Sequence, residues 1–136
     1  MLEQLRIHTD GQGLYEITSE VNSYLESSGV EEGICVVFVK HTSASLTVQE
    51  NADPSAKRDL ENWLNRLVPE RDALFTHTSE GPDDMPAHIK AALTLTSLSI
   101  PVTSGRLCLG TWQGIYLWEH RRASHSRSVL VKLLKG

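Results

Sequence analysis

The sequence predicts a single α+β domain over residues 1–136, with a mainly antiparallel, β-sandwich-like arrangement of strands and about three helices. Strand-like patterns outnumber helical ones and follow one another along much of the chain, which favours a mainly antiparallel α+β domain. The composition, 40% hydrophobic and 22% charged, is typical of a folded domain with its own core. No glycine-rich phosphate loop of known spacing is present, which argues against the parallel Rossmann and P-loop folds.

Most predicted strands alternate apolar and polar side chains, the pattern of a strand with one buried face. Residues 34–41, Ile-Cys-Val-Val-Phe-Val-Lys-His, differ because they are apolar on both faces until the last two positions. Ser104-Gly105 is a turn signal between two strand-like segments and predicts a hairpin there. The predicted strands cover residues 2–9, 14–17, 34–41, 43–50, 95–102, 106–109, 110–121 and 128–134.

Three segments carry helical signals. Residues 18–28 place apolar side chains at helical spacing and end before Gly29, which suits a helix C-terminus. The second helix is predicted to begin at Pro54, because Asp53 supplies a capping acceptor and proline fits the first turn. The third is predicted to begin near Pro86.

Residues 110–121, Gly-Thr-Trp-Gln-Gly-Ile-Tyr-Leu-Trp-Glu-His-Arg, predict a tight turn that leads into the central strand. By alternation, the two faces carry Tyr116, Trp118 and His120 on one side and Ile115, Leu117 and Glu119 on the other. Ionisable groups at the end of a strand that is apolar on both faces are costly to bury unless they pair, bind a metal or meet a ligand. A polar strand end that emerges into water is the simpler alternative.

The charge balance and the termini narrow the class of partner. A net charge of −4 argues against a nucleic-acid-binding surface, which is usually basic. No apolar run approaches the roughly 20 residues that span a bilayer, and the N-terminus lacks signal-peptide features. Cys35 and Cys108 both fall in apolar segments and are predicted to be buried, reduced thiols. We therefore expect a cytoplasmic protein with neither a nucleic acid nor a membrane as partner.

Three histidines stand at the edges of predicted elements: His41 and His120 at strand ends, and His88 in the first turn of a helix. Neutral imidazole is a common zinc ligand, and three histidines with an open fourth position are a known catalytic geometry. We predict that these three converge on one site. Histidines that only make hydrogen bonds at the ends of strands and helices would give the same sequence pattern. The remaining histidines lie in polar surroundings, where a surface role is expected: His8, His77 and His125.

Two glutamates also follow apolar strands. Glu50 ends an apolar strand face and is the stronger candidate for a desolvated base or metal ligand. Its alternative role is to end the strand and cap the next helix. Glu119 is predicted to point away from His120 and to orient a neighbouring histidine or pair with Arg121 or Arg122.

Five segments occur in the order and spacing of a known family: residues 41–46, 49–51, 81–88, 100–102 and 110–121. Together they resemble the YjbQ-like family of small proteins, described as secondary thiamine-phosphate synthases. The resemblance covers essentially the whole chain, and the Gly-Thr-Trp-Gln-Gly-Ile-Tyr block is highly specific.

The resemblance implies a compact α+β domain, a homotrimer with pockets near the subunit boundaries, and a polar pocket. It also implies a transferase reaction that joins a pyrimidine diphosphate to a thiazole phosphate and releases pyrophosphate, as a secondary activity. A divalent ion, zinc or magnesium, is a possible cofactor, and no organic cofactor is implied. The pocket residues that it implies are His41, Glu50, Asp53, His88, Gln113, Glu119 and His120. We predict Glu50, Asp53, Gln113, Glu119 and Arg121 for catalysis, and His41, His88 and His120 for the metal.

Arg121 is the nearest basic residue that could stabilise a departing diphosphate. Two alternatives remain open at this stage. One is metal-assisted hydrolysis of a small phosphorylated or acyl compound, with Glu50 activating a bound water. The other is a non-catalytic trimer that binds a small ligand or a metal.

Overall fold

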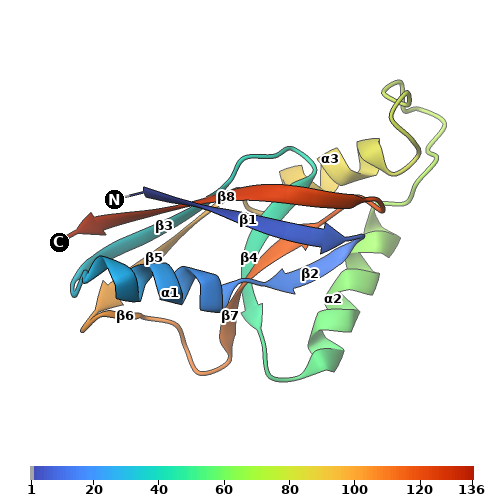
Figure 1. Ribbon diagram of the computed structural model, residues 1–136. Helices are drawn as coiled ribbons and strands as arrows, with labels where there is room; N and C mark the ends of the chain where they lie inside the picture. Colours follow the sequence, from blue (N-terminus) through green and yellow to red (C-terminus); the bar gives the residue numbers. More distant parts are fainter. Residues whose placement is uncertain (1) are drawn as a thin grey trace.

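Two antiparallel sheets carry the fold (Figure 1). The structure is a computed structural model that describes residues 2–136. The larger sheet has the strand order β1-β8-β3-β5-β6, and the smaller has the order β2-β7-β4. The strands are β1 (Leu2–Asp10), β2 (Gly13–Glu16), β3 (Gly33–Val39), β4 (Ala44–Glu50), β5 (Ser97–Thr103), β6 (Arg106–Leu107), β7 (Gln113–Glu119) and β8 (Ser124–Lys135).

Strand β7 lies at the centre of the smaller sheet, as the sequence predicts. Its last residue, Glu119, is opposite Gly13 of β2 and Ala44 of β4. At the other end of the strand, Gln113 is opposite Glu50. The ends of β4 and β7 are therefore two separate places in the molecule, each with its own polar residues.

The two faces of β7 pack into two different hydrophobic clusters. Ile115 and Leu117 lie in the main core between the sheets, together with aliphatic side chains of β3, β5 and β8 and of the first helix. Tyr116 and Trp118 face the other way and pack against Leu64 of the second helix. The alternation predicted for this strand is confirmed, and it explains why the strand is apolar on both sides.

Three helices complete the α+β domain: α1 (Thr18–Ser28), α2 (Pro54–Leu67) and α3 (Asp84–Leu93). Helix α1 ends at Gly29, whose φ of 73° is the left-handed conformation that glycine adopts readily. Helix α2 is capped by Asp53, whose carboxylate accepts a hydrogen bond from the Ser55 amide at 2.9 Å. None of the described helices is long and apolar enough to cross a membrane.

The predictions miss several boundaries, each for a local reason. Helix α3 begins at Asp84 rather than near Pro86, so a polar residue that the sequence assigns to a loop belongs to the helix. The predicted strand 106–109 shortens to β6, which leaves Cys108 exposed instead of buried. Strand β8 begins four residues before the predicted 128, because its polar start pairs with β1 and turns Arg127 inwards.

Candidate functional site

A polar cluster forms where β7 ends, beside the first turn of α3 and the loop that precedes this helix. Figure 1 shows the segment between α2 and α3 as an extended loop that leads into α3. The end of β7 supplies Glu119, and Arg121 lies two residues further along the chain. Helix α3 supplies Asp84 and His88, and the loop supplies His77.

Glu119 is fully buried and bound on both carboxylate oxygens. Its Oε1 accepts hydrogen bonds from Arg127 Nε at 2.7 Å and from the Thr9 hydroxyl at 2.7 Å. Its Oε2 contacts Arg127 Nη2 and accepts a hydrogen bond from the Arg121 amide at 3.0 Å. Burial raises the pKa of Glu119, but these hydrogen bonds, that of Arg127 first, outweigh burial and hold the pKa below its usual range. The geometry is that of an ion pair that fixes three strands, β1, β7 and β8.

The partner of Glu119 differs from the predicted one. The sequence suggests the side chain of Arg121 or Arg122, whereas the structure pairs Glu119 with Arg127 of β8. Only the backbone amide of Arg121 reaches the glutamate. Arg127 is eight residues away along the chain and lies in the polar start of β8, where alternation of apolar residues gave no strand signal.

Arg121 is held by two adjacent aspartates at the start of α3. Its Nε donates to Asp83 Oδ2 at 2.9 Å, and its Nη1 donates to Asp84 Oδ1 at 2.8 Å. Its Nη2 donates to the carbonyl of Glu80 at 2.9 Å, and the Arg122 amide also donates to Asp83. Burial raises the pKa of Asp83, but the hydrogen bonds from Arg121 and from the Arg122 amide leave it below its usual range. Arg121 thus links the end of β7 to α3 and fixes the orientation of Asp84.

His77 and His88 both face the second oxygen of Asp84. His77 Nε2 lies 2.7 Å from Asp84 Oδ2, and His88 Nε2 lies 3.2 Å from the same oxygen. The other ring nitrogen of His88, Nδ1, lies 3.1 Å from the carbonyl of Thr42 and donates to it, since a carbonyl only accepts. One ligand atom from each of His77, Asp84 and His88 lies within 4.8 Å of the others.

These three residues could hold a metal ion. Two imidazoles and one carboxylate form a ligand set found in zinc hydrolases and in non-haem iron enzymes, with further positions open to water or substrate. An imidazole that ligates a metal usually donates its other N–H to a carbonyl or a carboxylate, as His88 does to Thr42. Imidazole suits zinc and similar ions better than magnesium, which prefers oxygen ligands. Of the two ions expected from the sequence, the donor set therefore fits zinc.

The other two histidines predicted for the metal are engaged elsewhere, so His41, His88 and His120 do not form one ligand group among the described residues. His41 Nε2 accepts a hydrogen bond from the Ser128 amide at 2.8 Å, and burial and then Arg127 lower its pKa. His120 is buried, with its Nε2 2.9 Å from the Ser45 hydroxyl. Burial, and after it the charge of Lys90, lowers the pKa of His120 to about 3, so this imidazole is neutral.

The ligand group contains His77 and Asp84 beside His88, in place of the predicted His41 and His120. The polar surroundings of His77 in the sequence predict a surface position, and its side chain is 49% exposed. The signal that could have found the group is the spacing of Asp84 and His88, four residues apart and thus on one face of a helix.

The structure places the remaining predicted residues at the opposite end of the smaller sheet. Gln113 and Glu50 face each other there, six residues from the end marked by Glu119, which corresponds to roughly 20 Å of strand. Gln113 Oε1 accepts a hydrogen bond from the Gly110 amide at 2.7 Å and closes the turn before β7. Glu50 accepts one from the Asp53 amide at 3.2 Å, while Asp53 caps α2. Within one chain, these residues do not join the polar cluster.

Known proteins resemble this chain over most of its length. A family model described as "UPF0047 protein YjbQ-like" matches residues 3–136. The chain belongs to the YjbQ-like UPF0047 family. A UPF0047 protein of Synechocystis is 53% identical over 95% of this chain and 88% of its own length. YjbQ of Escherichia coli O157:H7 is 41% identical over 95% of this chain and 94% of its own length.

Solved structures share this fold over nearly the whole chain. A conserved hypothetical protein from Thermus thermophilus superposes with a TM-score of 0.87 at 36% identity, over 97% of this chain and 99% of that chain. A YjbQ/UPF0047 family protein from Clostridium acetobutylicum gives a TM-score of 0.84 at 38% identity, over 98% and 99% of the two chains. The descriptions of these proteins name no reaction.

The Glu119–Arg127 pair can be tested by removing one partner. Arg127→Met leaves a buried carboxylate without its cation and should lower the free energy of unfolding by about 3–5 kcal/mol. Because the pKa of Glu119 is lowered in the folded state, the contribution of the pair is present above the unfolded value, about pH 4.3, and is lost as the pH falls through the folded value. Chemical denaturation at a series of pH values measures both effects.

The exposed Arg66 of α2 supplies the matched control, and Arg66→Met should change the free energy of unfolding by less than about 1 kcal/mol. The difference between wild type and Arg127→Met should shrink as the pH falls towards and below the ordinary glutamate pKa of about 4.3. Equal stability of the two Met variants at neutral pH would contradict the role given to the pair.

Proposed function

We propose that this YjbQ-like protein is an enzyme that acts on a small phosphorylated molecule with the help of a zinc-type divalent ion bound by His77, Asp84 and His88. The observation that carries the proposal is the convergence of two imidazole nitrogens and one carboxylate oxygen within 4.8 Å. The donation from His88 Nδ1 to the Thr42 carbonyl supports it, because it leaves Nε2 free to act as a ligand.

A bound ion of this kind would polarise a phosphoryl oxygen or lower the pKa of a bound water. The residues of the chain have separate tasks around it. Asp84 is buried and its Oδ1 is held by Arg121, so its Oδ2 is aimed at the two histidines. His77 comes from the loop and is the most exposed of the three, which leaves the loop side of the site open to substrate.

Arg121 takes a positioning role in this proposal. Its Nε, Nη1 and Nη2 all donate to protein oxygens, two of them on Asp83 and Asp84. The predicted contact with a departing diphosphate would require these bonds to be exchanged. The geometry thus supports orientation of Asp84 more directly than it supports binding of the leaving group.

The specific reaction that we propose is the thiamine-phosphate synthase reaction, in which hydroxymethylpyrimidine diphosphate and thiazole phosphate are joined and pyrophosphate is released. Its support is the resemblance carried by residues 41–46, 49–51, 81–88, 100–102 and 110–121. Metal-assisted hydrolysis is the second candidate, because three protein ligands leave positions open to a water molecule. Glu50 is not placed to activate that water within one chain, since it lies at the far end of β4.

Metal content tests the ligand set. Protein purified without a histidine tag and equilibrated with zinc should bind one ion per chain, and His77→Ala should lower the affinity about 10- to 100-fold or more, because it removes one of three ligands. His77 lies in an exposed loop, so the fold should be unaffected. The control is His8→Ala, since His8 is also exposed and its ring lies beside Asp10 on β1, away from the proposed ligands. Equal zinc affinity of the two variants would contradict the assignment.

Turnover tests the reaction. With zinc present, we expect release of pyrophosphate from the two thiamine precursors, and a loss of about 100-fold or more in kcat/KM for His77→Ala, the scale of a lost catalytic electrostatic contact. Chelation of the metal should give the same loss. Stoichiometric zinc without turnover of these precursors or of simple phosphate esters would favour the non-catalytic binding protein instead.

We also propose that the protein is a homotrimer, as the family resemblance implies. The structure offers one supporting feature, a row of exposed apolar side chains on β3 and β8: Ile34 and Phe38 on β3, and Leu134, which is opposite Ile34. Exposed apolar surface of this kind often marks an interface. Light scattering at micromolar concentration should give three times the 15.1 kDa chain mass, and the mass of one chain would refute the trimer.

A further inference from the structure

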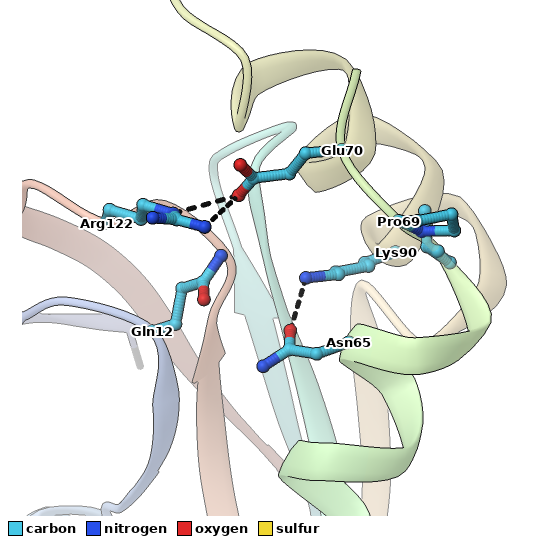
Figure 2. A pocket seen from close by; sticks show the side chains of 7 residues that line it. Gln12, Asn65, Pro69, Glu70, Lys90 and Arg122 are labelled. Atoms are coloured by element: carbon cyan, nitrogen blue, oxygen red, sulfur yellow. Dashed lines mark hydrogen bonds and ion pairs between the residues drawn. The ribbon is translucent and has the colours of Figure 1, made fainter. Parts of the chain in front are cut away.

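A cleft between α2, α3 and the turn that joins β1 to β2 takes no part in the proposed metal site (Figure 2). Its volume is about 310 Å³. Cavities of about 300 Å³ and more are typical of small-molecule sites. The lining residues are Gln12, Asn65, Val68, Pro69, Glu70, Lys90 and Arg122.

Lys90 is the unusual member of this lining. It is only 3% exposed, and its Nζ donates to Asn65 Oδ1 at 2.6 Å. An ammonium group has three hydrogens to donate, and this neutral amide oxygen takes one of them. No carboxylate of residues 2–136 lies within ion-pair distance of Nζ. A buried cation without an anionic partner is costly, so a ligand that supplies a negative charge would be stabilised here.

The carboxylate in the cleft is already engaged. Glu70 Oε2 accepts a hydrogen bond from Arg122 Nε at 2.9 Å and lies 2.8 Å from Arg122 Nη2. Figure 2 shows this pair on one side of the cleft and the Lys90–Asn65 pair on the other. The lining thus contains two cationic side chains and one anionic side chain, which leaves an excess of positive charge.

A second, smaller cavity of about 180 Å³ adjoins the first, because both are lined by Gln12 and Asn65. Its lining includes Trp118 and His120 at the end of β7, and also Glu61 and Glu119, whose carboxylates already accept hydrogen bonds from the Leu14 amide and from Arg127. An indole and a neutral imidazole can pack against a planar or apolar group. The two cavities together have room for a molecule with a charged end and an uncharged body.

We propose that this cleft binds the anionic group, a phosphate or a carboxylate, of a small molecule. Lys90 forms the ion pair, Asn65 and Arg122 flank it, and the rest of the molecule extends towards Trp118 and His120. The assignment does not depend on a metal ion. Lys90 lies six residues beyond Asp84 in α3, ~9 Å further along the helix axis, so the two sites can be tested separately.

Titration of metal-free ¹⁵N-labelled protein with inorganic phosphate, with acetate in a parallel series, tests the proposal. We expect saturable shifts of the side-chain amide signals of Asn65 in one or both series, and the anion that saturates them at the lower concentration identifies the preferred group. Lys90→Met keeps the apolar stem and should weaken binding about tenfold or more, as expected for the loss of a charged hydrogen bond. The control Lys132→Met, at an exposed position of β8, should bind as the wild type does.

Two further variants test whether a loss of binding comes from the cleft itself. Arg122→Met, at a side chain that is 67% exposed, should fold normally and also weaken binding, because it removes a cation and frees the charge of Glu70. His77→Ala should leave anion binding unchanged, which separates this cleft from the proposed metal site. The proposal is overturned if neither anion shifts the Asn65 signals, or if Lys90→Met and Arg122→Met both bind as the wild type does.

Discussion

The buried carboxylate of Glu119 is the group on which the arrangement of the candidate site depends. It joins β7 to β8 through Arg127 and to β1 through Thr9, and it also binds the Arg121 amide. A buried carboxylate is stable only while these partners remain in place, so the chain that leaves β7 has little freedom. Arg121 therefore points at the first turn of α3, where it orients Asp84 towards two histidines.

The segments that carry the family resemblance have two physical tasks. Residues 49–51 and 110–114 lie at one end of β4 and β7, where hydrogen bonds of Glu50 and Gln113 fix the turns. Residues 81–88 and 119–121 lie at the other end and build the polar cluster. The polar residues of these segments thus stabilise turns at one end of β4 and β7 and form the candidate site at the other end.

Much of the framework could be predicted from the sequence. The alternation in β7 identified the central strand and both of its faces, because side-chain direction in a strand follows from position alone. Asp53 and Gly29 marked helix ends through local hydrogen bonding and local backbone conformation.

The candidate site was harder to predict because its contacts are made across the fold. Arg127 lies in a polar stretch, and its role depends on the pairing of β8 with β1. His77 lies in an irregular loop, where the sequence has no hydrophobic periodicity that predicts the direction of a side chain. Lys90 gave no signal either, since only the packing of α3 against α2 shows that its amine is buried.

The central claim is that His77, Asp84 and His88 form one metal site, and anomalous diffraction at the zinc edge from crystals of the zinc-loaded protein tests it most directly. We expect one strong peak per chain at about 2.0–2.2 Å from His77 Nε2, His88 Nε2 and an Asp84 oxygen. A strong peak at other residues, or none beside Asp84 in fully loaded crystals, would contradict the account.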